Sequence, residues 1–308
     1  MMFKIVNLIV YVIIIVNPEA TSAEILTEIS SCLSTPLPNN WARSSEYNHR
    51  YYDWTRVFEE KKISICSHPG AGSTWFRHFL NKVATFISTN DQCLINMNLF
   101  YNDTSIHRPH GPPSQYRYHS IIPQCFNVLE EMPLSIVHNI GCDSNWYRYA
   151  IVRNPYAKLL SKYNDKIIVR KEYHRSPFHI EDGLNFSKFI IRLSEAGTDL
   201  KNMKLREEQF IDPHFRRGKL FCGSNYFQLI YIHYEKLKDF LLTFLKQLGL
   251  ENEPTLMVLL NQFSYNPIAE RKRLLLSYQS PNDVSLVRLY YEEEFRHFGY
   301  TSEFPPNY

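Results

Sequence analysis

The chain has 308 residues, of which 44% are hydrophobic, and this length and composition fit one large α/β domain with a sizeable core. The formal net charge is only +3, so composition does not indicate a nucleic-acid-binding protein. The six cysteines include no C-x-x-C pair, which argues against a zinc site, and we expect no metal cofactor.

Residues 1–23 have the layout of a secretory signal. Lys4 precedes an apolar stretch, Ile5–Val16, and the segment ends in the small residues Thr21-Ser-Ala23. The apolar stretch is shorter than the about 20 residues that a bilayer span needs, which favours a cleaved signal over a short type II signal-anchor. Either interpretation places the rest of the chain in the lumen of the secretory pathway, so we expect a lumenal or secreted protein.

The cysteines fit such an oxidising compartment, because their even number suggests disulfides. The pairing cannot be derived from the sequence, and Cys66, at the end of a predicted strand, is also compatible with a buried thiol. Two glycosylation sequons, Asn102-Asp-Thr104 and Asn185-Phe-Ser187, predict surface loops. The six cysteines are Cys32, Cys66, Cys93, Cys125, Cys142 and Cys222.

Residues 63–88 predict a strand, a phosphate-binding loop and a helix. A β-branched run ends in a turn with Gly70 and Gly72, and an amphipathic pattern begins after Ser73 and Thr74. The glycines let the backbone approach an anion, and the two hydroxyl residues suit a helix N-cap or a phosphate contact. The helix N-terminus directs its N–H groups and dipole at the same position. A plain turn with an N-cap is the alternative, and the loop lacks the Gly-Lys-Ser/Thr ending of a Walker A motif.

Two stretches predict irregular structure. Residues 24–60 form a lumenal lead-in that contains Pro36 and Pro38. Residues 100–124 are polar and rich in proline, and they predict a long excursion. Because long loops in compact domains are often functional, this excursion is a candidate cover for an acceptor site.

Residues 149–168 predict a second strand–helix unit. Tyr149–Val152 form an apolar strand, and Arg153 follows at its carboxyl end, where ligands bind in open parallel sheets. Pro155 suits the first turn of a helix, which places Ser161 about two turns along it. We therefore expect Arg153 and Ser161 to be surface groups that face one phosphate. This second signal favours nucleotide binding over the plain-turn interpretation of the first loop.

The remaining pattern alternates between strands and helices and predicts a parallel sheet. The elements are helices at 185–193 and 235–248, a strand at Leu229–His233 before the second of them, and a final helix at 283–298 that ends at Gly299.

Both strand–helix units resemble the sulfotransferase superfamily. Pro69-Gly-Ala-Gly-Ser-Thr-Trp75 is similar to the family loop P-K-S-G-T-T-W, which holds the 5′-phosphosulfate of PAPS (3′-phosphoadenosine 5′-phosphosulfate). Val152-Arg-Asn-Pro-Tyr-Ala-Lys-Leu-Leu-Ser-Lys-Tyr163 is similar to V-R-D-P-x-x-R-L-x-S-x-Y, which holds the 3′-phosphate. For Trp75, packing at the helix start is a better interpretation than adenine contact. The resemblance implies a cofactor-binding set of Pro69, Gly70, Ala71, Gly72, Ser73, Thr74, Trp75, Arg153 and Ser161.

Further stretches resemble the Golgi carbohydrate sulfotransferases of the chondroitin and HNK-1 type. Asp212-Pro-His-Phe215, then Cys222, then Tyr231-Ile-His-Tyr-Glu-Lys-Leu-Lys-Asp239 is similar to their D-x-H-W … C … Y-D-x-I-x-x-E-x-L-x-x-D. Leu289-Tyr-Tyr-Glu-Glu-Glu-Phe-Arg-His-Phe-Gly-Tyr300 is similar to their closing L-Y-x-x-D-F-x-x-F-G-Y.

This resemblance implies a P-loop-like single domain at 61–308, with a central parallel sheet flanked by helices. It also implies PAPS as co-substrate and transfer of a sulfuryl group to a hydroxyl of a glycan or glycolipid. Because the Golgi relatives are anchored, the resemblance favours a signal-anchor at the N-terminus and a Golgi lumenal location.

One departure from the family loop concerns catalysis. Gly70 stands where the family has a Lys that neutralises the bridging and leaving oxygens of the sulfate donor. Transfer then needs another cation, and His68, Arg77 and Lys62 are the nearest candidates in the sequence. A lumenal binding protein that kept the fold but lost transfer is one alternative function. A P-loop-like kinase or nucleotide hydrolase is another, although the missing Lys and the absence of a Walker B-like acidic strand end argue against it.

Transfer also needs a base for the acceptor hydroxyl, and the chain has 12 histidines. His138 precedes Arg153 by about the spacing at which a His serves as base in the related uronyl sulfotransferases. His119 lies in the excursion before it, and His214 lies in the Asp-Pro-His-Phe stretch. Each is also compatible with a structural or surface role. The histidines within 107–119 lack the spacing of a metal-ligand set.

Overall fold

The computed structural model describes most of the predicted domain. Predictions on residues 1–54, the excursion 100–124, Pro69 and His119 lie outside the described residues. For Ser73, Thr74 and His138, only the backbone is described. Within the described part of the chain, no helix is long and apolar enough to cross a membrane. The described residues are 55–68, 70–87, 127–128, 134–169, 185–203, 211, 214–217, 222 and 227–306.

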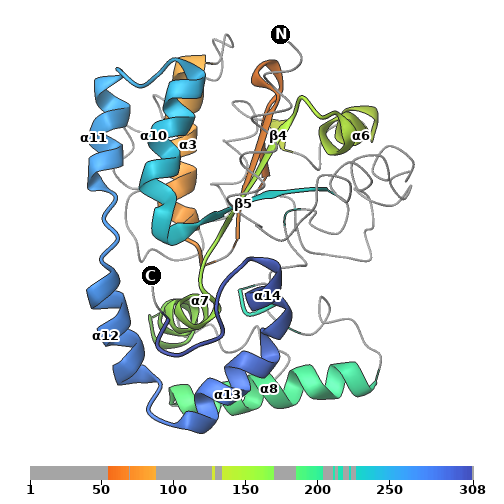
Figure 1. Ribbon diagram of the computed structural model, residues 1–308, viewed down its shortest axis with the longest axis vertical. Helices are drawn as coiled ribbons and strands as arrows, with labels where there is room; N and C mark the ends of the chain where they lie inside the picture. Colours follow the sequence, from red (N-terminus) through yellow and green to blue (C-terminus); the bar gives the residue numbers. More distant parts are fainter. Residues whose placement is uncertain are drawn as a thin grey trace.

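A five-stranded sheet in the order β3-β1-β2-β4-β5 forms the centre of the molecule (Figure 1). Strands β2, β4 and β5 are parallel, with Ile65 opposite Tyr149 and Ile151 opposite Ile232. This confirms the predicted central parallel sheet. Strands β1 and β3 add an antiparallel edge that the sequence analysis missed. The strands are β1 Thr55–Phe58, β2 Ile63–Ser67, β3 Asn127–Val128, β4 Tyr147–Val152 and β5 Ile230–His233.

Helices α3, Ser73–Ile87, and α10, Leu237–Leu248, cover one face of the sheet, and α11, Pro254–Gln262, packs against α3 farther from the strands. Helix α6, Leu134–Cys142, lies on the other side of the strands (Figure 1). Consecutive strand residues point to opposite faces, so Phe58 packs in the α3 cluster and Val57 in the α6 cluster. Helices on both faces explain why β2 is buried along its whole length.

A second apolar cluster lies beyond the carboxyl end of β4 and contains only helical and loop segments. Its centre is Tyr156 of α7, which is fully buried. The predicted helix at 185–193 extends to Asn202, and the one predicted at 283–298 is two helices that meet at Tyr291. Helix α12 was not predicted. The bounds are α7 Pro155–Lys162 with a π-helical extension Tyr163–Val169, α8 Phe186–Asn202, α12 Pro267–Ser277, α13 Pro281–Tyr290 and α14 Glu292–His297.

A disulfide joins Cys66 of β2 to Cys222. The expectation that Cys66 could be a buried thiol is therefore wrong, whereas the expected partial pairing of the cysteines is confirmed. Cys142, at the end of α6, is half-buried and is not a partner in this bond, and the other three cysteines lie outside the described residues. The bond connects the sheet, next to the predicted phosphate loop, to a segment 156 residues later in the chain.

Candidate functional site

The glycine loop follows β2 at the carboxyl edge of the parallel strands. The backbone N–H of His68 donates to the carbonyl of Ile151 at 3.0 Å, which continues the β2–β4 pairing to the start of the loop. Gly70 and Gly72 have φ angles of +93° and +66°, and a Cβ on Gly72 would collide with the ring of Tyr234. Glycine is therefore required here by conformation and by space.

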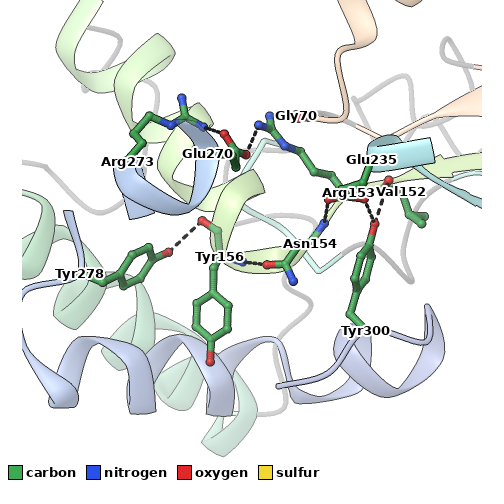
Figure 2. Close-up of polar contacts among 10 residues, drawn as sticks. All are labelled: Gly70, Val152, Arg153, Asn154, Tyr156, Glu235, Glu270, Arg273, Tyr278 and Tyr300. Carbon is green, nitrogen blue, oxygen red and sulfur yellow. Dashed lines mark hydrogen bonds and ion pairs between the residues drawn. The ribbon is translucent and has the colours of Figure 1, made fainter. Parts of the chain in front are cut away.

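Arg153 reaches this loop from the end of β4. Its Nη1 donates to the carbonyl oxygen of Gly70 at 3.0 Å (Figure 2). Adjacent parallel strands end at the same edge, so the structure brings Arg153 and the loop together, as the sequence predicted. The ligand that they hold stays a prediction.

The expectation that Arg153 is a surface group is wrong. The residue is 8% exposed, and its Nη2 forms an ion pair with Glu270 of α12. The second carboxylate oxygen of Glu270 accepts from Arg273 at 2.6 Å, as Figure 2 shows. The ring of Tyr234 lies 4.8 Å from the guanidinium carbon of Arg153. Arg153 is thus a buried cation whose charge is already matched by a carboxylate.

Arg153 stays charged in this environment. Burial by itself lowers the pKa of its guanidinium, but the nearby charges of Glu270, Tyr234 and Glu235 and the hydrogen bond to Glu270 outweigh it and raise the pKa above the usual value. An anion that binds Arg153 must therefore compete with Glu270 or share the arginine with it.

A second network fixes the N-terminus of α7. Asn154 caps the helix, because its Oδ1 accepts from the backbone N–H of Tyr156 at 3.0 Å. Glu235, just after β5, accepts from the backbone N–H of Asn154 at 3.3 Å and from the hydroxyl of Tyr300 at 2.7 Å (Figure 2). The hydroxyl of Tyr300 also lies 3.3 Å from the carbonyl of Val152. The C-terminal segment therefore holds the ends of β4 and β5 in place.

A protein-family model described as the sulfotransferase family matches residues 54–301, a range that includes the loop, Arg153 and both networks. The chain belongs to the sulfotransferase family. Sulfuryl transfer is accordingly the general chemistry of this domain, and the family is of the P-loop-like α/β class. No curated protein and no solved structure matches the chain.

Two of the three proposed substitutes for the loop lysine are wrong for this sulfotransferase. Lys62 precedes β2, at the opposite end of the strand from the loop, and its Nζ lies 3.1 Å from Asp143. His68 is buried, and its pKa lies well below the usual value because of burial first and then the charges of Lys158 and His297. A neutral imidazole supplies no cation at neutral pH. Arg77 is half-buried, one turn into α3.

The remaining predicted residues are placed as follows. Ala71 is fully buried. The ring centroid of Trp75 lies 5.4 Å from that of Phe79, on which it stacks, and 4.8 Å from that of Phe263, which agrees with a packing role for Trp75. Ser161 is half-buried in the last turn of α7. The structure therefore brings the described loop residues and the β4–α7 residues to one edge of the sheet.

The histidine candidates are spread over different elements. His138 lies in α6, on the face of the sheet opposite α3. His214 is half-buried and lies two residues before Arg216, whose carbonyl lies 3.4 Å from the Nζ of Lys158. Of the two candidate bases that the structure describes, His214 is thus in the segment next to α7. Among the residues that the structure describes, no group of three or more histidines, cysteines or carboxylates is arranged to hold a metal ion.

Sequence analysis missed the carboxylates that face the cations of the site. Glu270 pairs with Arg153, and Glu294 of α14 accepts from the Nζ of Lys158 at 2.7 Å with both oxygens. Glu235 lies in the stretch Tyr231–Asp239, which resembles the carbohydrate sulfotransferases, so its match to the family pattern could have marked it as a site residue. Glu270 follows a helix-starting Asn-Pro pair, and no local pattern distinguished it from a surface carboxylate.

Proposed function

We propose that this sulfotransferase moves a sulfuryl group from PAPS to a hydroxyl of a glycan in the secretory pathway. The observation that carries the proposal is the 3.0 Å hydrogen bond from Arg153 Nη1 to the carbonyl of Gly70. It places a permanent cation against a glycine loop that leads into a 15-residue helix. These are the two elements whose motifs resemble the donor-binding motifs of the family.

The site suits a nucleotide with phosphates at two ends. Phe76 N–H donates to Gly72 O at 3.0 Å at the start of α3. The first N–H groups of a helix have no intrahelical acceptor, so the N-terminal amides of α3 would serve an anion bound there. Arg153 and Ser161 would hold the 3′-phosphate from the α7 side. Main-chain donors on one side and a charged side chain on the other fit a ligand that carries two separate anionic groups.

In sulfuryl transfer, an acceptor hydroxyl attacks sulfur in line while 3′,5′-adenosine diphosphate leaves. Catalysis requires positioning, a base for the hydroxyl proton, and positive charge near the leaving oxygen. We propose His214 ahead of His138 and His119 as the base, because its segment contacts α7 through the carbonyl of Arg216. Its replacement by Ala should lower turnover without changing affinity for the nucleotide product.

A second candidate function is a lumenal binding protein that takes the nucleotide without transferring sulfate. The replacement of the family lysine by Gly70 favours it, because the loop then has no side-chain cation for the departing oxygen of the donor.

The secretory location rests on the signal-like segment 1–23 and on the disulfide between Cys66 and Cys222, since disulfides persist in oxidising compartments. We propose a Golgi lumenal or secreted protein, with a membrane anchor, if present, at residues 5–16. The proposed acceptor is a glycan or glycolipid rather than a nucleic acid. Mass mapping without reduction tests the compartment, because the secreted form should carry the Cys66–Cys222 bond.

The deciding experiment measures transfer of labelled sulfate from PAPS to a panel of glycans and glycolipids, together with calorimetric affinities for 3′,5′-adenosine diphosphate and ATP. Transfer to a glycan supports the enzyme. Tight binding of 3′,5′-adenosine diphosphate without transfer to any acceptor supports the binding protein. A preference for ATP contradicts both and indicates a kinase or hydrolase.

A further inference from the structure

Gly70 leaves a space beside α7 that lysine side chains fill. A Cβ added at this glycine would lie 2.9 Å from Cγ of Lys158, and it would lie 3.2 Å from Cε and 3.3 Å from Cγ of Lys162. Both lysines project from α7 toward the loop. The volume that a side chain of residue 70 would occupy is therefore taken by two cationic side chains from another element.

The two lysines differ in their electrostatic partners. Both oxygens of Glu294 accept from the Nζ of Lys158 at 2.7 Å, and the side chains of this pair are 3% and 1% exposed. The ion pair of Lys162 with Asp165 is longer, at 3.8 Å, and the Asp165 side chain is 33% exposed. Water screens the second pair more strongly. The Lys162–Asp165 pair is therefore cheaper to break for a bound anion than the Lys158–Glu294 pair.

Lys162 also lies next to the anion-binding elements. The stem of Lys162 fills the side-chain space beside Gly70, the carbonyl of Gly70 accepts from Arg153, and the loop leads directly into α3. An anion held at the N-terminus of α3 thus lies close to the cationic side of α7. The Lys162 side chain is 12% exposed, so a charge contact there is only partly screened by solvent.

We propose that Lys162 supplies the positive charge at the departing oxygen of the sulfate donor. This inference rests on the proposed function and deepens it. In the transfer step, the acceptor oxygen forms a bond to sulfur and the bond from sulfur to the bridging oxygen breaks. The electron pair of that bond stays on the departing oxygen, and the acceptor proton passes to a base. The Lys162 ammonium stabilises the negative charge that develops on the departing oxygen.

The test combines turnover with the affinities for two nucleotides. 3′,5′-Adenosine diphosphate carries the departing phosphate, and adenosine 3′-monophosphate lacks it. We expect Lys162→Met to lower kcat for transfer from PAPS by about 100-fold, the loss typical for one preorganised donor. It should weaken binding of 3′,5′-adenosine diphosphate about tenfold, which is the lower end for one charge-assisted hydrogen bond. Affinity for adenosine 3′-monophosphate should not change.

Two further variants control for charge and for folding. Lys162→Arg keeps the charge and should retain most of the turnover and affinity. Lys188→Met removes an exposed lysine of α8 and should change neither. If Lys162→Met does not fold, Lys162→Gln replaces it in every measurement, because it keeps the length and polarity of the side chain.

The outcomes separate this inference from the proposed function. If the wild-type protein binds 3′,5′-adenosine diphosphate but transfers no sulfate, the proposed enzymatic function is wrong. A loss of affinity for 3′,5′-adenosine diphosphate alone in Lys162→Met would still support the position of Lys162 beside the departing phosphate. If Lys162→Met binds 3′,5′-adenosine diphosphate as the wild type does, or loses both nucleotides equally, the inference is overturned at any level of turnover.

Discussion

The two sides of the candidate site differ in how they present positive charge. The loop at 70–74 contains only glycine, alanine, serine and threonine, so its side chains carry no charge. The end of β4 and helix α7 carry Arg153, Lys158 and Lys162 within three turns of chain. The main chain therefore serves one side of the site and cationic side chains serve the other.

The cationic side is also the more tightly balanced. Arg153 and Lys158 each face a buried carboxylate, Glu270 and Glu294, from helices close to the C-terminus. We therefore expect the affinity of the proposed site for an anion to depend on how strongly these carboxylates hold Arg153 and Lys158.

Removal of Lys158 should produce the largest change, and it should be a change in stability. Lys158→Ala leaves the carboxylate of Glu294, which is fully buried, without its cation. Losing one partner of a buried ion pair typically costs about 3–5 kcal/mol of unfolding free energy. Urea unfolding of the variant measures this loss.

The matched control is the double variant Lys158→Met, Glu294→Leu, which removes both charges and should recover much of the stability. An unchanged unfolding midpoint in Lys158→Ala would mean that the buried pair does not hold α7 in place.

Arg153 and Glu270 should have opposite effects on nucleotide affinity. Arg153→Ala should weaken binding of 3′,5′-adenosine diphosphate by about 10- to 100-fold, because it removes charge-assisted hydrogen bonds. Its cost in stability should be smaller than that of Lys158→Ala, since Arg273 still pairs with Glu270. Glu270→Gln should raise the affinity several-fold, because the amide competes less for Arg153. Calorimetry measures both.

Glu251→Gln, which neutralises an exposed carboxylate, is the control for the change in net charge. Equal affinities in the wild type and Arg153→Ala would remove Arg153 from the site. Ser161→Ala should weaken binding less than Arg153→Ala, since a neutral hydroxyl makes the weaker hydrogen bond.

Substitution of Gly70 should damage the loop side. Gly70→Ala has to adopt a φ of +93° and to displace the stems of Lys158 and Lys162. Gly249→Ala, at the end of α10, is a matched control with a φ of +72° and no atom within 4 Å of the added Cβ. Left-handed backbone costs about 1–2 kcal/mol at either position, so any excess loss at Gly70 measures the steric contact with α7.

Gly70→Lys should consequently lower turnover, because the new ammonium has to share its space with two others. An increase in turnover would show that the lysines of α7 do not serve the departing oxygen.

The pH dependence of His68 should be the smallest effect. The pKa of His68 is lowered in the folded state, mainly by burial, so the unfolded chain binds the extra proton first as pH falls. Its contribution to stability is therefore constant above the unfolded pKa of about 6.5 and is lost below it. Between pH 7 and pH 6 the expected loss is under about 1 kcal/mol.

His68→Gln should remove this part of the pH profile of urea unfolding. A variant whose stability still falls by the same amount between pH 7 and pH 6 would assign the dependence to another group.

Local signals in the sequence were sufficient for the strands and loops of the site. Apolar β-branched runs predicted the strands β2, β4 and β5, and two glycines before a hydroxyl pair predicted the start of α3. Pro155 predicted the start of α7, since proline suits the first helical turn. These features depend on residues within a few positions of each other, so the family resemblance could be derived from the sequence. The meeting of Arg153 with the loop, 83 residues earlier, followed from the rule that adjacent parallel strands end at the same edge of a sheet.

Only the tertiary structure decided which charges meet. Arg153 and Glu270 are 117 residues apart, and Lys158 and Glu294 are 136 residues apart. Coulombic attraction depends on distance through space and on burial, and neither is encoded by a local pattern. The same limit applies to the Cys66–Cys222 bond and to the position of the Lys162 stem in the side-chain space beside Gly70. Local sequence therefore determined the glycine loop and the helix starts of the candidate site. The packing of the C-terminal helices against α7 determined which of its cations face buried carboxylates.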